Sequence, residues 1–318
     1  MAVEVAMPWT PTDRVGEALR RLRVTGLFYC RTEAAGPWAV DMPAFADCLS
    51  FHVVTAGECW VQVPGAEPVR LHAGDLALVP HGRGHLLLSE PGTPSLGRVD
   101  RLPQEYVTEH YSVLRHEGPG PTTGLICGVL SMDGPAARPL LELLPAVVHV
   151  AAREDRPWIA DSLALMASEV ATTRAGGEAI TTRLADILVI QAVRAWIDDQ
   201  TSARGWLAAV RDPHLGAAVA EVHRDPAAPW TVSSMARHAS MSRSAFAARF
   251  TSVVGVPAMA YVQAWRMHVA ADLLAGGATV ASAAAATGYG SAAAFSRVFT
   301  RAAGRPPGSV RRAVPLEP

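Results

Sequence analysis

The side chains of this chain that can do chemistry are four cysteines, eleven histidines and twenty-eight arginines, and the sequence contains no lysine. Its first residues carry neither a basic segment nor a long apolar one, so we expect no secretory signal and a cytoplasmic protein. Four cysteines in so long a cytoplasmic chain are typical of free thiols, metal ligands or a redox sensor, and not of a disulfide framework. They are Cys30, Cys48, Cys59 and Cys127.

The arginines are unevenly distributed along the chain. The formal net charge is −1, but residues 230–318 contain nine arginines against Asp272 and Glu317, a net charge of +7. The first 229 residues therefore carry −8. A basic end on an acidic body favours a nucleic-acid partner, with an ordinary solvated surface as the alternative. A guanidinium group can hold a phosphate or a guanine through two donors.

Length and composition limit the fold class. The chain has 318 residues, which favours two domains, since a domain averages roughly 150 residues. Half of the residues are hydrophobic and 18% are charged, so a sizeable core is available and wholesale disorder is excluded. No run of about 18 uncharged apolar residues occurs, so we expect no membrane-spanning segment.

The region after residue 230 contains an internal repeat. Thr231 and Ala236 recur 48 residues later as Thr279 and Ala284. In each copy a threonine begins a short helix, a turn follows, a serine caps a second helix, two phenylalanines anchor it, and a glycine ends it. The following residues recur at a spacing of 49: Phe246, Phe250, Gly255 and Pro257, as Phe295, Phe299, Gly304 and Pro306.

This plan predicts two helix-turn-helix motifs, in each of which the second helix would enter a DNA major groove. Two copies could read successive major-groove faces about 34 Å apart, with residues 258–275 as one rigid helix that sets their spacing. The alternative is a helical bundle without a DNA partner, since phenylalanine pairs and glycine stops occur in any bundle. The repeat, its turns and the positive charge favour double-stranded DNA as the partner.

The same region resembles the tandem helix-turn-helix domain of AraC/XylS-type transcription regulators. The resemblance covers the domain from end to end and is carried by residues 255–257, 261–262, 265–267, 279–280, 288–299 and 304–307.

The resemblance also implies which positions face DNA. Most of them are short side chains, so we expect sparse direct readout of bases and a large contribution of DNA shape. Arg243, Arg249 and Arg301 are expected to hold the phosphate backbone. Among the positions that face DNA, Arg297 is the best candidate for a base or phosphate contact. The base-facing positions are Ser244, Ala247 and Ala248 in the first reading helix and Ala292, Ala293, Ser296 and Arg297 in the second.

Residues 1–135 consist of short apolar runs, such as 51–54 and 60–63, separated by glycine and proline. Short strands at this spacing predict a sandwich or barrel. Residues 74–85 fit G-x5-P-x-G-x2-H, a turn, an apolar strand and a bend that would place His85 inward, and this pattern resembles the second motif of the cupin barrel. The paired histidines and glutamate of the first cupin motif are missing, which disfavours a cupin metalloenzyme. The aligned positions hold Pro43, Phe45 and Ser50.

The first half and the middle of the chain together resemble a subgroup of AraC-type regulators with a divergent cupin. The carrying residues include 51–60, 127–128 and 183–186. Members of this subgroup hold two cysteines and two histidines in the barrel, and some are linked to sensing reactive oxidants. Two thiolates and two imidazoles suit a closed tetrahedral zinc site, whose oxidation would eject the metal. The corresponding residues here are Cys30, His52, His85 and Cys127.

Strand geometry separates the remaining cysteines from this set. Cys48 and His52 lie four residues apart on one strand face, about 13 Å, too far to share a metal ion. Cys59 follows a hairpin turn, and we expect it near the tip, so both cysteines are interpreted as packing residues. A small organic ligand in the barrel is the alternative effector, with an apolar wall contributed by Trp38, Phe51 and Trp60.

The middle of the chain predicts a helical hairpin, with helices over residues 158–175 and 178–199. Apolar residues cover more than one side of the second helix, which favours a homodimer through this hairpin; packing within one chain is the alternative. The predicted fold is thus multidomain α+β. It divides into a cupin-like barrel at 1–135, a dimerisation hairpin at 136–204 and an all-α tandem helix-turn-helix domain at 205–318.

These features favour a transcription regulator that responds to a signal, either a zinc and thiol redox switch or a small ligand. RNA polymerase is a further partner if the protein is an activator. The alternatives are a constitutive DNA-binding protein with a purely structural barrel and, from another class, a cupin enzyme with an appended helical domain.

Overall fold

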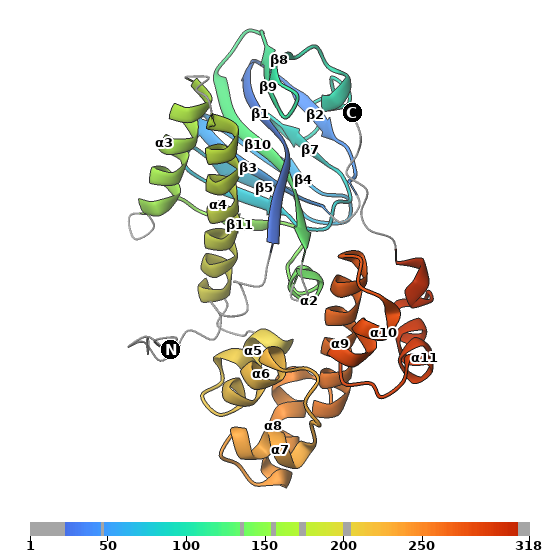
Figure 1. The fold of residues 1–318 in the computed structure, drawn as a ribbon. Coiled ribbons are helices and arrows are strands. Elements are labelled where there is room, and N and C mark those ends of the chain that lie inside the picture. Colours follow the sequence, from blue (N-terminus) through green and yellow to red (C-terminus); the bar gives the residue numbers. More distant parts are fainter. Residues whose placement is uncertain are drawn as a thin grey trace, which may run out of the picture. The chain divides into compact units, whose positions relative to one another are not determined.

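The computed structural model describes residues 23–45, 48–133, 137–153, 157–171, 176–199 and 205–310 (Figure 1). The amino-terminal segment, the boundary residues 134–136 and 200–204, and Arg311, Arg312 and Glu317 of the charge count lie outside these ranges. The chain divides into two compact units. We call residues 24–132 and 144–201 the sheet unit, and residues 1–23, 133–143 and 202–318 the helical unit.

The strands of the sheet unit form two sheets, one with the order β11-β6-β3-β10-β1-β9-β8 and one with the order β2-β7-β4-β5. The sequence predicts a barrel; among the described residues the strands form these two sheets, and closure into one barrel is not observed. The bounds of the strands, with one short 3-10 helix η1, are β1 (Arg23–Ala35), β2 (Ala39–Met42), β3 (Cys48–Ala56), β4 (Glu58–Gln62), β5 (Val69–His72), β6 (Leu76–Val79), β7 (His85–Leu88), η1 (Val99–Arg101), β8 (Glu105–Thr108), β9 (Tyr111–His116), β10 (Thr122–Asp133) and β11 (Val148–Val150).

An apolar core fills the sheet unit, because alternate residues of each strand point to the same side. We call this set the interior cluster; it contains three of the four cysteines. Strand β3 is buried on both faces over its first seven residues, so it lies at the centre of the unit. The interior cluster includes Cys30, Trp38, Val54, Cys59, Val61, Leu71, Ala77, Leu87, Leu114, Leu125 and Cys127.

Two helices, α3 (Pro157–Ala171) and α4 (Gly177–Asp199), pack against each other, and α4 also contacts β6 and β11 (Figure 1). Both predicted helices of the hairpin are therefore present; residues 172–175, the predicted end of the first, lie outside the described residues. Large apolar side chains remain exposed on the pair. They are Leu165, Ile180 and Ile187.

Short helices build the helical unit around one longer helix, α9 (Ala258–Ala275), as the sequence predicts. The other elements are α2 (Ala137–Leu141), α5 (Gly205–Arg211), α6 (Leu215–Arg224), α7 (Val232–His238), α8 (Arg243–Val254), α10 (Val280–Ala286), α11 (Ala292–Ala303) and the 3-10 helix η2 (Pro307–Ser309). Helix α2 belongs to this unit although the element described before it along the chain, β10, lies in the sheet unit.

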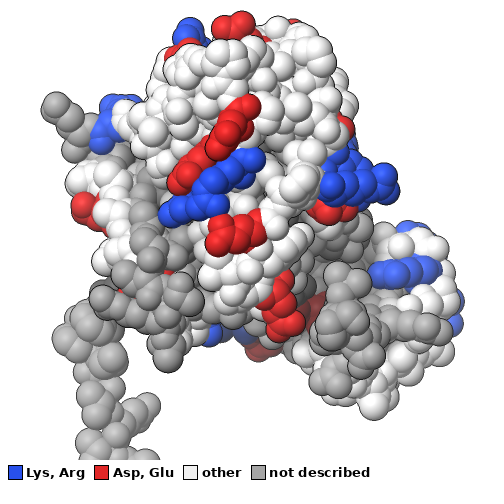
Figure 2. Space-filling model, turned by 90° about the horizontal axis from the view of Figure 1, so that it is seen from above, with Lys and Arg blue, Asp and Glu red and all other residues white. Residues whose placement is uncertain are grey.

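Arginines on the sheet unit have acidic neighbours. On the face shown in Figure 2, basic and acidic side chains lie side by side. Arg115 pairs with Glu33 at 3.4 Å and Glu105 at 2.6 Å, and Arg98 pairs with Asp100 at 2.9 Å. These arginines are therefore compensated locally.

By length and composition, no single helix among those described could cross a membrane. Of the described helix pairs, only α8 and α9 taken together pass such a test, as a pair bent by 57° at the break between them.

Candidate functional site

The helical unit contains two helix-turn-helix motifs, α7–α8 and α10–α11, with matching ends. Ser242 and Ser291 cap α8 and α11, each through a hydroxyl that accepts a hydrogen bond from the backbone three residues on. Gly255 and Gly304 end the same helices in the left-handed conformation, at φ of 86° and 68°. Because these signals are local, the predicted caps and stops are all found where the repeat places them.

A pair of phenylalanines anchors each reading helix. The rings of Phe246 and Phe250 lie 5.4 Å apart and those of Phe295 and Phe299 lie 5.6 Å apart, and all four side chains are buried. With these residues turned inward, the opposite face of each helix is left to solvent. The fold thus presents α8 and α11 as two similar, fixed surfaces.

The predicted DNA-facing residues lie on these surfaces. Ala247 and Ser296 are half-buried and the others are exposed. Within the described part of the chain, no ion pair is found for Arg243, Arg297 or Arg301. The exposed residues are Arg243, Ser244, Ala248, Arg249, Ala292, Ala293, Arg297 and Arg301.

Arg249 differs from the other arginines of the reading helices. Its Nε and Nη2 both donate to Oδ2 of Asp212, at 3.0 and 2.7 Å, and only 8% of the Asp212 side chain is exposed. Burial raises the pKa of Asp212, but the Arg249 hydrogen bonds and the backbone N–H groups of His214 and Leu215 outweigh it and lower the pKa overall. Arg249 therefore already holds a carboxylate, and its expected phosphate contact stays a prediction.

A joint between the two motifs was missed by sequence reasoning. The guanidinium of Arg266 donates to the backbone oxygens of Pro226 and Ala228, at 2.7 and 2.8 Å, and lies over the Tyr289 ring at 5.9 Å. A Cβ at Gly288 would come within 2.6 Å of the Ala227 oxygen. The turn of the second motif therefore packs against the segment that leads into the first.

Two buried histidines meet inside the sheet unit. His52 on β3 and His85 on β7 come from different sheets, and their Nε2 atoms lie 2.6 Å apart, so one ring donates a hydrogen to the other. Burial lowers the pKa of both imidazoles, that of His85 to about 4, and both are neutral near pH 7. The predicted inward position of His85 is found. His52 Nδ1 has no hydrogen-bond partner among the described residues.

Three thiols share this interior. Cys127 is the register partner of His52 across β10 and β3, so the two side chains lie on the same sheet face. Burial raises the pKa of Cys127 well above its usual value, with smaller contributions from Cys30 and Cys59. Burial also raises the pKa of Cys59 to about 12. Cys59 follows the turn at Gly57, as expected, and its side chain is fully buried in the interior cluster, which agrees with a packing role.

The candidate zinc ligands are brought together only in part. The two histidines are in contact and Cys127 is a strand neighbour, whereas the Cys30 thiol contacts Thr32 Oγ1 at 3.6 Å and Gln104 Oε1 at 3.9 Å. Across the described ranges, no three or more His, Cys, Asp or Glu side chains are grouped so that they could hold a metal ion. Cys48 lies outside the interior cluster.

The apolar wall expected for an organic ligand is also only partly present. Trp38 belongs to the interior cluster. Phe51 is buried against Tyr29, on the opposite side of β3 from His52, and Arg70 lies over Trp60 at 5.8 Å. The expectation that Phe51 and Trp60 face the interior is therefore wrong, because neighbouring strand residues alternate in direction.

Comparison with known proteins agrees with both units. Residues 13–198 match a family described as Cupin, and residues 235–313 match a family described as Helix-turn-helix domain. An AraC-like transcription regulator of Streptomyces lividans is 34% identical over 94% of this chain and 98% of its own length. The transcriptional regulator AlkR of Acinetobacter baylyi is 31% identical over 86% of this chain and 90% of its own length.

Among solved structures, ToxT of Vibrio cholerae with a bound unsaturated fatty acid is similar over 90% of this chain and 93% of its own, at 12% identity and a TM-score of 0.36. The two family matches and the regulators at more than 30% identity decide the class of protein. The chain belongs to the AraC family: it is a DNA-binding transcription regulator rather than an enzyme, with a cupin-like part ahead of its helix-turn-helix domain.

Proposed function

We propose that the cupin-like part detects a chemical signal and thereby changes how tightly the tandem helix-turn-helix holds an operator in double-stranded DNA. The observation that carries the proposal is the buried pair of His52 and His85. A buried polar atom without a hydrogen-bond partner costs about 1–3 kcal/mol, and within the described part of the chain His52 Nδ1 is such an atom. Apolar side chains would hold the two sheets together without that cost, so a role in sensing explains the pair better than packing.

The signal that we favour is oxidation of a thiol-ligated zinc site formed by Cys30, His52, His85 and Cys127. The donor types fit, since two imidazoles and two thiolates make a closed tetrahedral set. Two ligands of such a site lie about 3.3 Å apart, so the Nε2 atoms, now at 2.6 Å, would have to separate by less than 1 Å. Cys127 enters from the neighbouring strand, and Cys30 would have to leave Thr32.

The thiols supply the response to the signal. Zinc, when bound, keeps its sulfur ligands in the thiolate form, which is the form that reacts with oxidants. A peroxide transfers one oxygen atom to the sulfur of Cys30 or Cys127, giving a sulfenic acid, and is itself reduced to water. The oxidised sulfur is a poorer ligand, so the four side chains no longer hold the metal and the sheets rearrange.

A route from the histidine pair toward the reading helices runs through contacts within each unit and along the chain. His81, in the loop that leads to His85, contacts the Leu144 oxygen through Nε2 at 3.1 Å within the sheet unit. Leu144 follows helix α2, whose Pro139 oxygen accepts a hydrogen bond from Trp206 Nε1 at 3.3 Å within the helical unit. A shift of His85 would thus be passed to α2 and on to α5.

We further propose that two copies associate through α3 and α4, where Leu165, Ile180 and Ile187 are 56%, 46% and 45% exposed. A self-complementary pairing of this face would cover apolar surface that one copy leaves to solvent. The regulator would act in the cytoplasm, where it meets its DNA. RNA polymerase is the further partner if it activates transcription.

Metal analysis of the full-length protein, purified under reducing conditions, tests the zinc site. We expect one zinc per chain, lost in Cys127→Ser and kept in the matched variant Cys48→Ser, whose cysteine is also buried but lies outside the interior cluster. Thermal melting checks that both variants fold. Wild-type protein without zinc would exclude the thiol switch and leave a small organic effector as the alternative.

The variant His81→Ala tests the route. It should retain zinc, because His81 is not a proposed ligand, while its operator affinity stops responding to oxidant. A response equal to that of the wild type would show that the signal does not pass through the His81 contact.

A further inference from the structure

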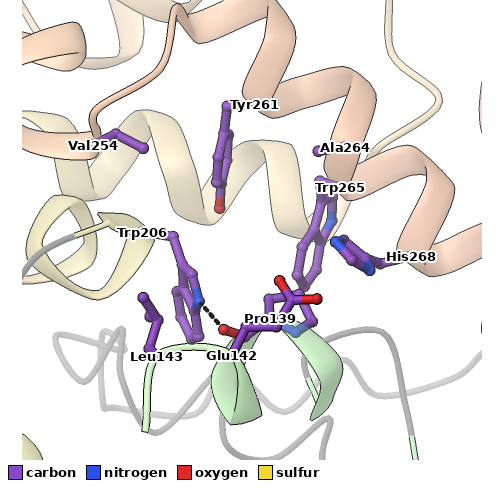
Figure 3. Close-up of a pocket in the computed structure, with 9 residues that line it drawn as sticks. All are labelled: Pro139, Glu142, Leu143, Trp206, Val254, Tyr261, Ala264, Trp265 and His268. Atoms are coloured by element: carbon purple, nitrogen blue, oxygen red, sulfur yellow. Dashed lines mark hydrogen bonds between the residues drawn. The ribbon is translucent and has the colours of Figure 1, made fainter. Parts of the chain in front are cut away.

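We propose that the helical unit carries a second binding site, for a small organic cation, in the cavity shown in Figure 3. The cavity has a volume of about 180 Å³, and all the residues that line it belong to the helical unit. The proposal goes beyond the sensing function above, because it involves neither the interior histidines nor the thiols.

Three aromatic side chains form the walls of the cavity. Trp206 comes from α5, and Tyr261 and Trp265 come from successive turns of α9; Figure 3 shows the two indoles on opposite sides with the phenol between them. All three side chains are buried. Aromatic faces attract a cation through the negative charge of their π systems, and tryptophan does so best.

The walls are held in place before any ligand arrives. The His223 ring stacks on Trp265 with 3.7 Å between the ring centres, and its Nε2 lies 2.5 Å from the Tyr261 hydroxyl. The Trp206 indole N–H donates to the Pro139 oxygen. Because contacts within the protein already fix these rings, ordering them would take little from the free energy of ligand binding.

A carboxylate gives the cavity its charge preference. Glu142 lines the cavity just after α2, and Figure 3 shows its carboxylate turned toward the side of Trp265. Aromatic rings together with one carboxylate are the usual surroundings of a bound alkylammonium group. The imidazole of His268 also lines the cavity on this side, and the remaining lining, Val254 and Ala264 among it, contributes apolar surface.

The size of the cavity restricts the ligand. Drug-sized molecules occupy sites of roughly 300–1,000 Å³, so a cavity of about 180 Å³ suits a much smaller cation, of the size of choline. The occupant would touch the α2 segment and α9 together. Helix α9 sets the spacing of the two motifs. Ligand binding would therefore hold the α2 segment, through which the chain leaves the sheet unit, against α9.

The experiment is a titration of the full-length protein, labelled with 5-fluorotryptophan, followed by fluorine NMR. Choline is the probe, and 3,3-dimethylbutan-1-ol, which has the same shape without the charge, is its control. We expect choline to shift the Trp206 and Trp265 signals saturably and the neutral alcohol to bind about ten-fold more weakly. Equal binding of the two, or no saturable shift with choline, would overturn the proposal.

Substitutions locate the site. Glu142→Gln should weaken choline binding by about two- to five-fold and leave the alcohol unaffected, whereas Glu221→Gln, an acidic residue of α6 that pairs with Arg224, should change neither. Ala264→Leu fills the cavity from an exposed helix position and should abolish binding. Unchanged choline binding in both Glu142→Gln and Ala264→Leu would place the cation elsewhere and refute the site.

Discussion

The two helix-turn-helix motifs share one frame but are fastened differently. Each reading helix has a serine cap, a buried phenylalanine pair and a glycine stop. In the first motif, Arg249 is tied to Asp212, at the start of α6. In the second, Arg297 and Arg301 project from α11, and the turn is fixed instead by Gly288 and Tyr289.

The difference indicates which arginines stabilise the fold and which are available to bind DNA. The Arg249 guanidinium already pairs with a carboxylate of the protein, so less of its positive charge is available to a DNA phosphate. The arginines of α11 are exposed, and a guanidinium in that state can grip the DNA backbone. We therefore expect the second motif to contribute more of the electrostatic affinity for DNA. The first motif should be held more firmly by contacts within the protein.

The largest expected effect is the loss of stability on truncating the phenylalanine pairs, which both motifs share. Phe250→Ala and Phe299→Ala each empty a fully buried site, and each should lower the free energy of unfolding by about 3–5 kcal/mol. Denaturant titration of the two variants measures the loss. A cost below about 1 kcal/mol for either would mean that its motif is not held by the phenylalanine pair.

The next largest effect is a difference in stability between variants of two glycines. Gly288→Ala forces a Cβ to within 2.6 Å of the Ala227 oxygen at a φ of 78°, whereas Gly255→Ala meets no atom within 4 Å at a φ of 86°. Backbone strain should cost about 1 kcal/mol in both, and the clash about 1–3 kcal/mol more at Gly288. Equal melting temperatures of the two variants would contradict the joint between the motifs.

The third effect is on DNA. Arg297→Ala should weaken operator binding about ten-fold and reduce the slope of log affinity against log salt by about 0.9, as for one lost phosphate contact. Arg249→Ala is the matched variant and should reduce the salt slope by less, because Asp212 already holds part of the Arg249 charge. A slope that falls in Arg249→Ala and not in Arg297→Ala would reverse the comparison.

The smallest effect is on pH dependence. The pKa of Asp212 is lowered in the folded protein, so the stabilisation from its pair with Arg249 is present above the unfolded pKa of about 3.9 and is lost as the pH falls through the lower folded value. Asp212→Asn should therefore flatten the fall in stability below about pH 4. An unchanged acid limb in urea titrations between pH 3 and 7 would show that the pair contributes nothing measurable.

The sequence was sufficient for features that depend on neighbours along the chain. The caps, the phenylalanine pairs, helix 258–275 and the inward direction of His85 all follow from local spacing. Features set by distant contacts were missed. Arg249 and Asp212 are 37 residues apart, and the docking of α2 beside Trp206 joins residues 67 apart.

The candidate site inside the sheet unit could be predicted from the sequence only in part. Residue types suggested the histidines and Cys127, but only strand register decides which side chains share a face, and it turned Cys59 inward and Phe51 away. One residue of shift exchanges the two faces of a strand, so sequence alone could not settle this.

The most direct test of the central claim is the operator affinity of the full-length, zinc-loaded protein before and after treatment with hydrogen peroxide. We expect a change of at least about ten-fold on oxidation, the order expected for a coupling free energy between two sites, and no such change in Cys127→Ser. Equal affinities of the reduced and oxidised wild-type protein would contradict the thiol switch.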